Sequence, residues 1–244
     1  MQKSLETKER ILHAAKKEFA ERGFDGARMG SIARRANANQ ALLHYYFKSK
    51  EKLYEEVLSY YFIIEDEKLF REGLSKFTLT RHEELYIGIY LLVKLPFGGL
   101  DPDFSRIMSR EVAEGRKHLR NLTLEYFLPR VKSFQEIIEV GVEEGVFETT
   151  SPHMVIMQMM SFVISWHNQQ QTDEEDVAID LPGIDSGSSQ EVLDFLLNYT
   201  FKGLTPVGQV VAIPAIKAEV IDVLDDTIEE ISAIHSGKSI QETS

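Results

Sequence analysis

The sequence predicts an all-α fold, in which a small N-terminal head of three helices is followed by a larger helical body and one extra C-terminal helix. Apolar residues recur at spacings of three and four along most of the chain, which is the period of a helix with one buried face. Residues that start and stop helices punctuate these runs, and no segment shows the strict alternation of a strand. The head, the body and the C-terminal extension are expected to cover residues 1–52, 53–205 and 206–244.

The first helix is expected over residues 4–22, with Gly23 as its stop. Its buried face consists of apolar residues three and four positions apart: Ile11, Leu12, Ala15 and Phe19. Small and apolar residues further on are expected to form the inner faces of two shorter helices: Ile32, Ala33, Ala36, Leu43 and Phe47. Together these residues predict one small core for the head.

The segment Ala27–Lys52 is the most informative part of the chain, because it reads as a helix-turn-helix followed at once by a third helix. In the turn, Asn37 can adopt a left-handed backbone and Asn39 can cap the next helix. That helix, Gln40–Tyr46, is only about two turns long and presents its polar N-terminal end outward. A short helix held in this way across a tight turn is what a reader of the DNA major groove requires. The head is therefore expected to bind DNA.

The body is predicted to contain helical runs at residues 50–77, 81–95, 101–115, 116–145, 152–170 and 189–203. Ser49 is expected to cap the first run, and Pro152 to open the fifth. Pro129 predicts a kink or a break near Phe127, because proline cannot continue a helix behind it. The acidic stretch 173–188, which is rich in Gly and Ser, predicts a loop.

Composition excludes several classes of protein. With 43% hydrophobic and 27% charged residues the chain should be globular, and no apolar run approaches the ~20 residues of a membrane span. No signal segment is expected, and the absence of Cys excludes disulfides and agrees with a reducing, cytoplasmic location. Histidines at metal-ligand spacing, a phosphate loop and a catalytic pair are all lacking, so the sequence predicts neither a metal, a cofactor nor an enzyme.

Charge divides the chain in the same place as the motif. Residues 1–52 carry 12 Lys and Arg against 6 Asp and Glu, a net charge of +6, whereas residues 53–244 carry 15 against 33, a net charge of −18. Such polarity suits a basic head that touches phosphates and an acidic body kept away from them. An uneven charge is common in soluble proteins, but here the basic part coincides with the helix-turn-helix.

A set of residues across the first 55 positions resembles the N-terminal domain of the tetracycline-repressor (TetR/AcrR) family: residues 7–15, Phe19, Gly23-Phe24, Ile32-Ala33, Leu43, Tyr46-Phe47 and Lys48–Leu53. The resemblance implies an all-helical homodimer whose two heads meet successive major grooves of a palindromic operator. It also implies that a small molecule bound in the larger domain releases the DNA. The sequence departs from the family pattern at Arg28, Gly30, Asn37 and His44, and the chain continues beyond the family's common end near Gly203.

The expected DNA-binding residues lie on and around the second helix of the motif: Arg28, Asn39, Gln40, Ala41, Leu42, His44, Tyr45, Lys48 and Lys50. The Gln40 amide can pair with adenine in a bidentate fashion, and Leu42 can touch a thymine methyl. His44 and Tyr45 are better suited to phosphate contacts. Lys50 lies in the first turn of the next helix, where its ammonium and the free backbone N–H groups favour a phosphate. The alternative is an ordinary solvated surface.

Aromatic and sulfur-containing side chains are numerous in the body. The residues expected to line an apolar ligand pocket are Tyr61, Phe62, Tyr86, Tyr90, Phe104, Met108, Phe127, Phe134, Phe162, Trp166 and His167. For any one of them a simple core position is the stronger expectation. The function predicted from these features is a repressor released from a palindromic operator by a small apolar effector. The alternative is an effector-independent architectural or cell-cycle DNA-binding protein that uses its body for protein contacts.

A homodimer is expected to form through the helices at residues 152–170 and 189–203, with apolar contacts from Met154, Val155, Met159, Phe162, Val163 and Trp166. Residues 206–214, between two prolines, are expected to be extended, and residues 215–235 to form a last helix. Its apolar stripe comprises Ile216, Val220, Val223, Thr227, Ile231 and Ile234. We expect this stripe to pack on the dimerisation helices of either subunit; a separate protein partner and a mobile tail are the alternatives.

Overall fold

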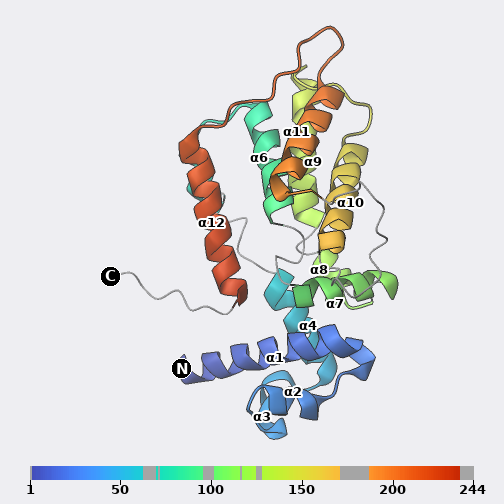
Figure 1. The fold of residues 1–244 in the computed structure, drawn as a ribbon, viewed down its shortest axis with the longest axis vertical. Helices are drawn as coiled ribbons and strands as arrows, with labels where there is room; N and C mark the ends of the chain where they lie inside the picture. The colour runs from blue at the N-terminus through green and yellow to red at the C-terminus, as the bar shows by residue number, and fades with distance from the viewer. Residues whose placement is uncertain are drawn as a thin grey trace. The chain divides into compact units, whose positions relative to one another are not determined.

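The computed structural model describes residues 2–62, 70, 72–95, 102–115, 117–124, 128–170 and 187–236. Every regular element among these residues is a helix (Figure 1), as the sequence predicted. Contacts divide the chain into two compact units. Unit 1 comprises Met1–Asp66, Gly98–Tyr126 and Glu229–Ser244, and unit 2 comprises Glu67–Phe97 and Phe127–Ile228. The functional boundary expected after residue 52 stays a prediction, since this grouping places further helices with the head.

Unit 1 contains α1 (Gln2–Gly26), α2 (Met29–Arg35), α3 (Gln40–Phe47), α4 (Lys50–Phe62), α7 (Pro102–Ala113) and the short α8 (Arg120–Leu122). Helix α1 packs against α2, α4 and α7, and α3 packs against α2 and α4. The core that these helices share includes the residues expected from the sequence: Ile11, Leu12, Ala15, Phe19, Ile32, Ala33, Ala36, Leu43 and Phe47. The regular part of α1 ends at Gly23, whose φ of 68° and ψ of 175° break the helix where the stop was predicted.

The turn between α2 and α3 has the conformation that its two asparagines predict. Asn37 adopts a left-handed backbone with φ 47°. The side chain of Asn39 caps α3, because its Oδ1 accepts a hydrogen bond from the Leu42 backbone N–H at 2.7 Å. The predicted helix-turn-helix geometry is therefore confirmed at the level of single residues.

Unit 2 contains α6 (Arg81–Lys94), α9 (Leu128–Glu143), α10 (Pro152–Gln170), α11 (Ser189–Leu204) and most of α12 (Ala218–Ser236). Helix α6 packs against α9, α10 and α11, and α9 packs against α10. Capping boxes begin two of these helices, Thr80 with Glu83 at α6 and Ser188 with Glu191 at α11. None of the helices in the described ranges is long and apolar enough to cross a membrane.

Several helix ends differ from the sequence-based expectation. The run expected over residues 116–145 contains α8 and α9, and Pro129 lies in the first turn of α9, where its missing N–H is tolerated. The kink or break expected near Phe127 falls on residues 125–127, which lie outside the described residues. Helix α4 is described as far as Phe62, and residues 63–69 of the run expected to residue 77 lie outside the described residues. Most of the loop expected at residues 173–188 also lies outside them.

The C-terminal extension begins with residues 205–217, which carry no helix or strand. The stretch expected to be extended includes a turn at Pro206–Gln209, where the Gln209 N–H donates to the Pro206 carbonyl. Helix α12 follows, and the Tyr90 hydroxyl of α6 donates a hydrogen bond to its Asp225 carboxylate. Gly73 also lies against it, since a Cβ added there would lie 2.7 Å from Val223 Cγ1. The packing expected on the dimerisation helices is thus corrected: the extension packs on α6 of its own chain, and Figure 1 shows the two helices side by side.

Candidate nucleic-acid interface

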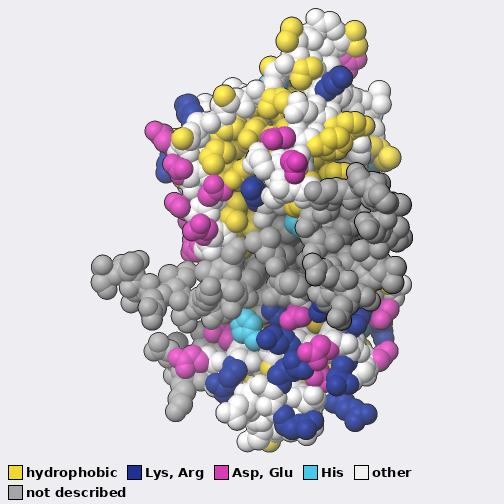
Figure 2. Space-filling view, viewed as in Figure 1, with side chains coloured by type: hydrophobic (Ala, Val, Ile, Leu, Met, Phe, Trp, Pro, Cys, Tyr) yellow, Lys and Arg dark blue, Asp and Glu magenta, His cyan; other side chains and the backbone are white. Residues whose placement is uncertain are grey.

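Helix α3 presents a polar and aromatic surface at the edge of the basic head. Six of the nine predicted contact residues are exposed on or next to this helix: Asn39, Gln40, Ala41, His44, Tyr45 and Lys48. Arg28 is exposed at the N-cap of α2, while Leu42 and Lys50 are half-buried. Tyr45 is 70% exposed, which is unusual for so large a ring in a domain that buries its other aromatic residues well. Figure 2 shows Lys and Arg side chains gathered over this part of unit 1.

The exposed side chains of α3 fall into two groups. Asn39 is committed to its capping bond and therefore contributes to the shape of the helix rather than to base contacts. Gln40 has a free amide surface, and its Oε1 lies 3.8 Å from the position of a Cβ on Gly30. A side chain at Gly30 would therefore make ordinary van der Waals contact with this amide. Gln40 thus remains the side chain best placed to pair with a base edge.

The C-terminal turn of α3 is held by local contacts among the remaining predicted residues. Lys48 has φ 65° and ends the helix, and its Nζ donates to the Tyr45 carbonyl at 3.0 Å. The same ammonium lies 5.5 Å from the centroid of the Tyr45 ring. The His44 Nδ1 lies 3.2 Å from the Lys48 carbonyl oxygen. These contacts order the far end of the helix and leave its side chains accessible to a phosphate backbone.

Lys50 has a different role from the one expected. Its Nζ donates to the carbonyls of Phe24, Asp25 and Ala27 at 2.9, 3.3 and 3.3 Å, and lies 4.6 Å from the centroid of the Phe24 ring. An ammonium has three N–H donors, and all three are occupied by carbonyls at the C-terminal end of α1. The expected phosphate contact is therefore corrected to a structural one, in which Lys50 caps the C-terminal end of the first helix.

Lys50→Ala is accordingly expected to act through stability. The substitution leaves three carbonyls without their charged donor, at a cost of about 1–3 kcal/mol, so the melting temperature of the full chain should fall by several degrees. Lys52→Ala is the matched control, because Lys52 lies in the same turn and makes only an exposed ion pair with Glu55. If Lys50→Ala weakens DNA binding but leaves the melting temperature unchanged, Lys50 contacts a phosphate, as first expected.

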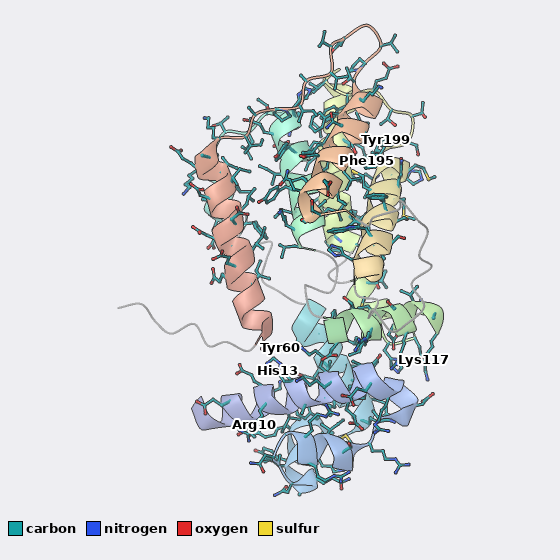
Figure 3. All side chains as sticks on the ribbon, viewed as in Figure 1. Arg10, His13, Tyr60, Lys117, Phe195 and Tyr199 are labelled. Carbon is teal, nitrogen blue, oxygen red and sulfur yellow. The ribbon has the colours of Figure 1, made fainter. Side chains whose placement is uncertain are left out.

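Two further contacts of the head were not predicted from the sequence. Arg10 of α1, labelled in Figure 3, donates through its Nε to the Ala36 carbonyl at 2.9 Å and so supports the turn of the motif. Arg35 forms a bidentate ion pair with Glu21, with distances of 2.9 and 2.7 Å. Both pairs join residues that are far apart in the sequence. Helical periodicity relates only residues three or four positions apart, so it does not predict such contacts.

Unit 1 contains a buried polar cluster where α4, α7 and the residues just before α8 meet. Glu111 of α7 is 1% exposed, and its carboxylate accepts hydrogen bonds from the Tyr54 hydroxyl at 2.9 Å and from the His118 backbone N–H at 3.1 Å. The His118 Nδ1 lies 2.9 Å from the same carboxylate. Burial and the adjacent carboxylate raise the pKa of Tyr54, so its hydroxyl stays a donor. These bonds fix α7 to α4 within unit 1.

The residues expected to line a ligand pocket are divided between the two units. Phe104 and Met108 belong to unit 1, and Tyr86, Tyr90, Phe134, Phe162, Trp166 and His167 belong to unit 2. Phe127 and the side chains of Tyr61 and Phe62 lie outside the described residues. A pocket lined by the whole set stays a prediction.

Within unit 2, His167 is the most informative of these residues. Its ring bonds the Val93 backbone, and burial lowers the pKa of the imidazole, which therefore stays neutral at pH 7. The His167 Nε2 is buried and has no hydrogen-bond partner among the described residues. The neighbouring Trp166 donates its indole N–H to the Gly187 carbonyl at 3.4 Å. A polar atom left unpaired among aromatic side chains is a natural contact for a bound molecule.

An apolar face is exposed on α10 and α11. Phe195 of α11 is 51% exposed and Tyr199 is 53% exposed, and their rings stack at 5.8 Å. Phe162 of α10 lies 5.4 Å from Phe195, so the three aromatic rings form a row across both helices. Figure 3 shows Phe195 and Tyr199 projecting from α11. Phe162 is thus a surface residue, and the expectation that it lines the ligand pocket is corrected.

The interface residues expected from the sequence need a second correction. Met154 and Phe162 are exposed and fit the prediction, and Val155 is half-buried. Met159, Val163 and Trp166 are instead buried in the core of unit 2. The exposed apolar residues of the face are Met154, Met157, Phe162, Ile164, Phe195 and Tyr199.

Comparisons with known proteins agree with this geometry. Residues 11–57 match the family model described as bacterial regulatory proteins, tetR family. The "Probable HTH-type transcriptional regulator YttP" of Bacillus subtilis is 26% identical over 165 residues, which are 68% of this chain and 79% of that protein. The HTH-type transcriptional repressor NicS of Pseudomonas putida is 46% identical over 52 residues, which are 21% of this chain and 24% of that protein.

Solved structures are similar over most of the chain. The crystal structure of HlyIIR, a haemolysin II transcriptional regulator, is 25% identical and matches with a TM-score of 0.54, covering 79% of this chain and 97% of that one. A helix-turn-helix head followed by a helical body defines a DNA-binding transcriptional regulator. Through residues 11–57 the chain is similar to the tetR family of bacterial regulatory proteins.

Proposed function

We propose that this protein is a homodimeric repressor that binds a palindromic operator through α3 and is released by a small apolar effector. The observation that carries the proposal is the exposed surface of α3, where Gln40, His44 and Tyr45 project from a helix that its own cap and turn hold rigidly. Rigid positioning of a short helix is what base recognition demands. The exposed row of aromatic rings on α10 and α11 supplies a surface for the second subunit.

Binding is tested with the full chain and duplexes selected from a random DNA library. We expect one palindromic sequence to be enriched, and its affinity to fall steeply with salt, because Lys and Arg contacts release counterions from the phosphates. Gln40→Ala should raise the dissociation constant for the selected operator by ~5- to 150-fold and leave random DNA unaffected, as the loss of one bidentate base contact requires. Gln190→Ala, an exposed glutamine on α11, is the control. Equal losses on both DNAs would refute the role of Gln40.

The effector is proposed to bind in unit 2 near His167, whose ring lies 4.4 Å from that of Trp166 and whose Nε2 is buried without a hydrogen-bond partner among the described residues. Tyr86 and Phe134 of the same unit belong to the pocket lining predicted from the sequence. A ligand that is mostly apolar and carries one hydrogen-bonding group fits these residues. The regulator from Saccharomonospora viridis whose structure was solved with choline shares this fold at 19% identity. A compound that raises the melting temperature and weakens operator binding would support the proposal. A screen in which every stabilising compound leaves operator binding unchanged would favour the effector-independent alternative.

A further inference from the structure

The segment between α11 and α12 exposes apolar side chains to an unusual degree. In this connecting arm, residues 205–217, Val207 is 93% exposed and Val210 is 89% exposed, and Val211 and Ile213 are exposed as well. Figure 2 shows hydrophobic side chains on the projecting end of unit 2. The sequence has no charged residue from position 203 to position 216. A contiguous uncharged surface of β-branched residues marks an interaction site.

The connecting arm is held in place at its base and at its turn. The Glu148 carboxylate accepts a hydrogen bond from the Val207 backbone N–H at 2.9 Å. The Gln209 N–H donates to the Pro206 carbonyl at 3.0 Å and closes a turn in which Gly208 has φ 88°, a conformation that glycine adopts without strain. The backbone from Pro206 to Gln209 is therefore held before any partner binds, which reduces the entropy lost when this part of the arm docks.

We infer that the connecting arm docks on a second copy of this chain, as an extension of the dimer surface on α10 and α11. This inference rests on the proposed homodimer. The arm continues directly from α11, and Tyr199 lies less than two helical turns before it, about 9 Å along the helix axis. The exposed aromatic rings and the exposed valines are thus carried by consecutive parts of the chain, α11 and the arm that follows it.

The N-terminal half of α10 is the surface on the second copy that fits the arm. Met154 and Met157 are exposed there, and flexible thioether side chains adapt to an inserted valine. Residues 149–172 carry no Lys, Arg, Asp or Glu, and the arm carries none before Lys217 at its end, so the docking of residues 205–216 on this helix desolvates no charge. Glu148, which anchors the arm, lies just before α10, so both surfaces are at the same end of unit 2. Nucleic acid and anionic lipid would instead require several Lys or Arg beside the valines, whereas the arm carries only Lys217 at its end.

The first test is the double variant Val207→Ser and Val210→Ser in the full chain, followed by sedimentation across a dilution series. Burial of two valines predicts that their loss raises the dimer dissociation constant by about tenfold or more. The melting temperature of the monomer should not change, because both side chains are in water within one chain. Val112→Ser, at an exposed valine of α7, is the matched control. An unchanged dissociation constant in the double variant would overturn the inference.

The second test uses the absence of cysteine from the chain. Copies with Val210→Cys are mixed with copies that carry Met154→Cys, and a disulfide between the two is expected under mild oxidation, since docking brings the two positions within bridging distance. Copies with Asp226→Cys, on the exposed face of α12, replace the Met154 variant in the control. Preferential bridging between two Val210→Cys copies would overturn the assigned surface. A wild-type chain that stays monomeric would refute the proposed function itself, whereas a dimer unaffected by changes in the arm refutes this inference alone.

Discussion

Phe195→Glu is expected to leave the chain folded and to make it monomeric. The ring is half in water within one chain, so its replacement does not disturb the core. In the proposed dimer the new carboxylate would be buried against Phe162 and Tyr199, and the sequence offers no Lys or Arg from position 133 to position 201 to pair with it. An unpaired buried charge costs several kcal/mol, so the dimer dissociation constant should rise by ~100-fold or more.

The affinity for the operator should fall as the dimer dissociates. A monomer contacts only one half-site and loses the gain in affinity that comes from linking two heads. Sedimentation and operator titration on the same samples measure both effects. Phe195→Leu keeps the surface apolar and is expected to retain the dimer, while Asp226→Lys controls for a change of charge on an exposed helix face. A Phe195→Glu chain that remains dimeric at low micromolar concentration would contradict the assigned interface.

Glu111→Leu is expected to destabilise unit 1 strongly. Leucine removes the acceptor of the Tyr54 hydroxyl and of the His118 backbone N–H, and both donors are left in the interior without a partner. Removing one partner of a buried polar interaction of this kind lowers the free energy of unfolding by about 3–5 kcal/mol, so the melting temperature should fall by roughly 6–20 °C. Thermal unfolding followed by circular dichroism measures the change. DNA binding should disappear at the lower temperature at which unit 1 unfolds.

Two controls separate the cluster from a general effect of the substitution. Glu114→Leu changes an exposed glutamate just after the same helix and is expected to alter the melting temperature by less than about 2 °C. Tyr54→Phe removes one donor together with its need for an acceptor, so it should cost less than Glu111→Leu, about 1 kcal/mol. Equal melting temperatures for Glu111→Leu and the wild type would show that the buried carboxylate contributes nothing to stability.

Features that depend on neighbouring residues were predictable. The left-handed Asn37, the cap formed by Asn39 and the stop at Gly23 all follow from the conformational preferences of single residue types. The start of α9 at Leu128 agrees with Pro129, which is tolerated in the first turn of a helix because it has no N–H. The exposure of α3 follows from the polar residues on its outer face.

Features that depend on residues far apart were not predictable to the same degree. Lys50 looked like a phosphate ligand because it begins a helix, and only the approach of the end of α1 turns its ammonium inward. Phe162 looked like a pocket residue because aromatic residues are usually buried, yet it lies beside Phe195 on an exposed face. Helical periodicity gives the width of an apolar stripe, but it does not show whether the stripe is buried in the core of its own chain or exposed as a binding surface.

By itself the sequence determined that the fold is all helical, where most of the described helices begin and end, and which short helix follows the turn of the helix-turn-helix. These properties arise from hydrogen bonds, caps and periodicity within a few residues of each position. Only the tertiary structure decided that Lys50 caps α1, that Glu111 holds Tyr54 and His118, and that α12 packs on α6. Each of these depends on which surfaces meet after the chain has folded, and that choice is made by the packing of the whole domain.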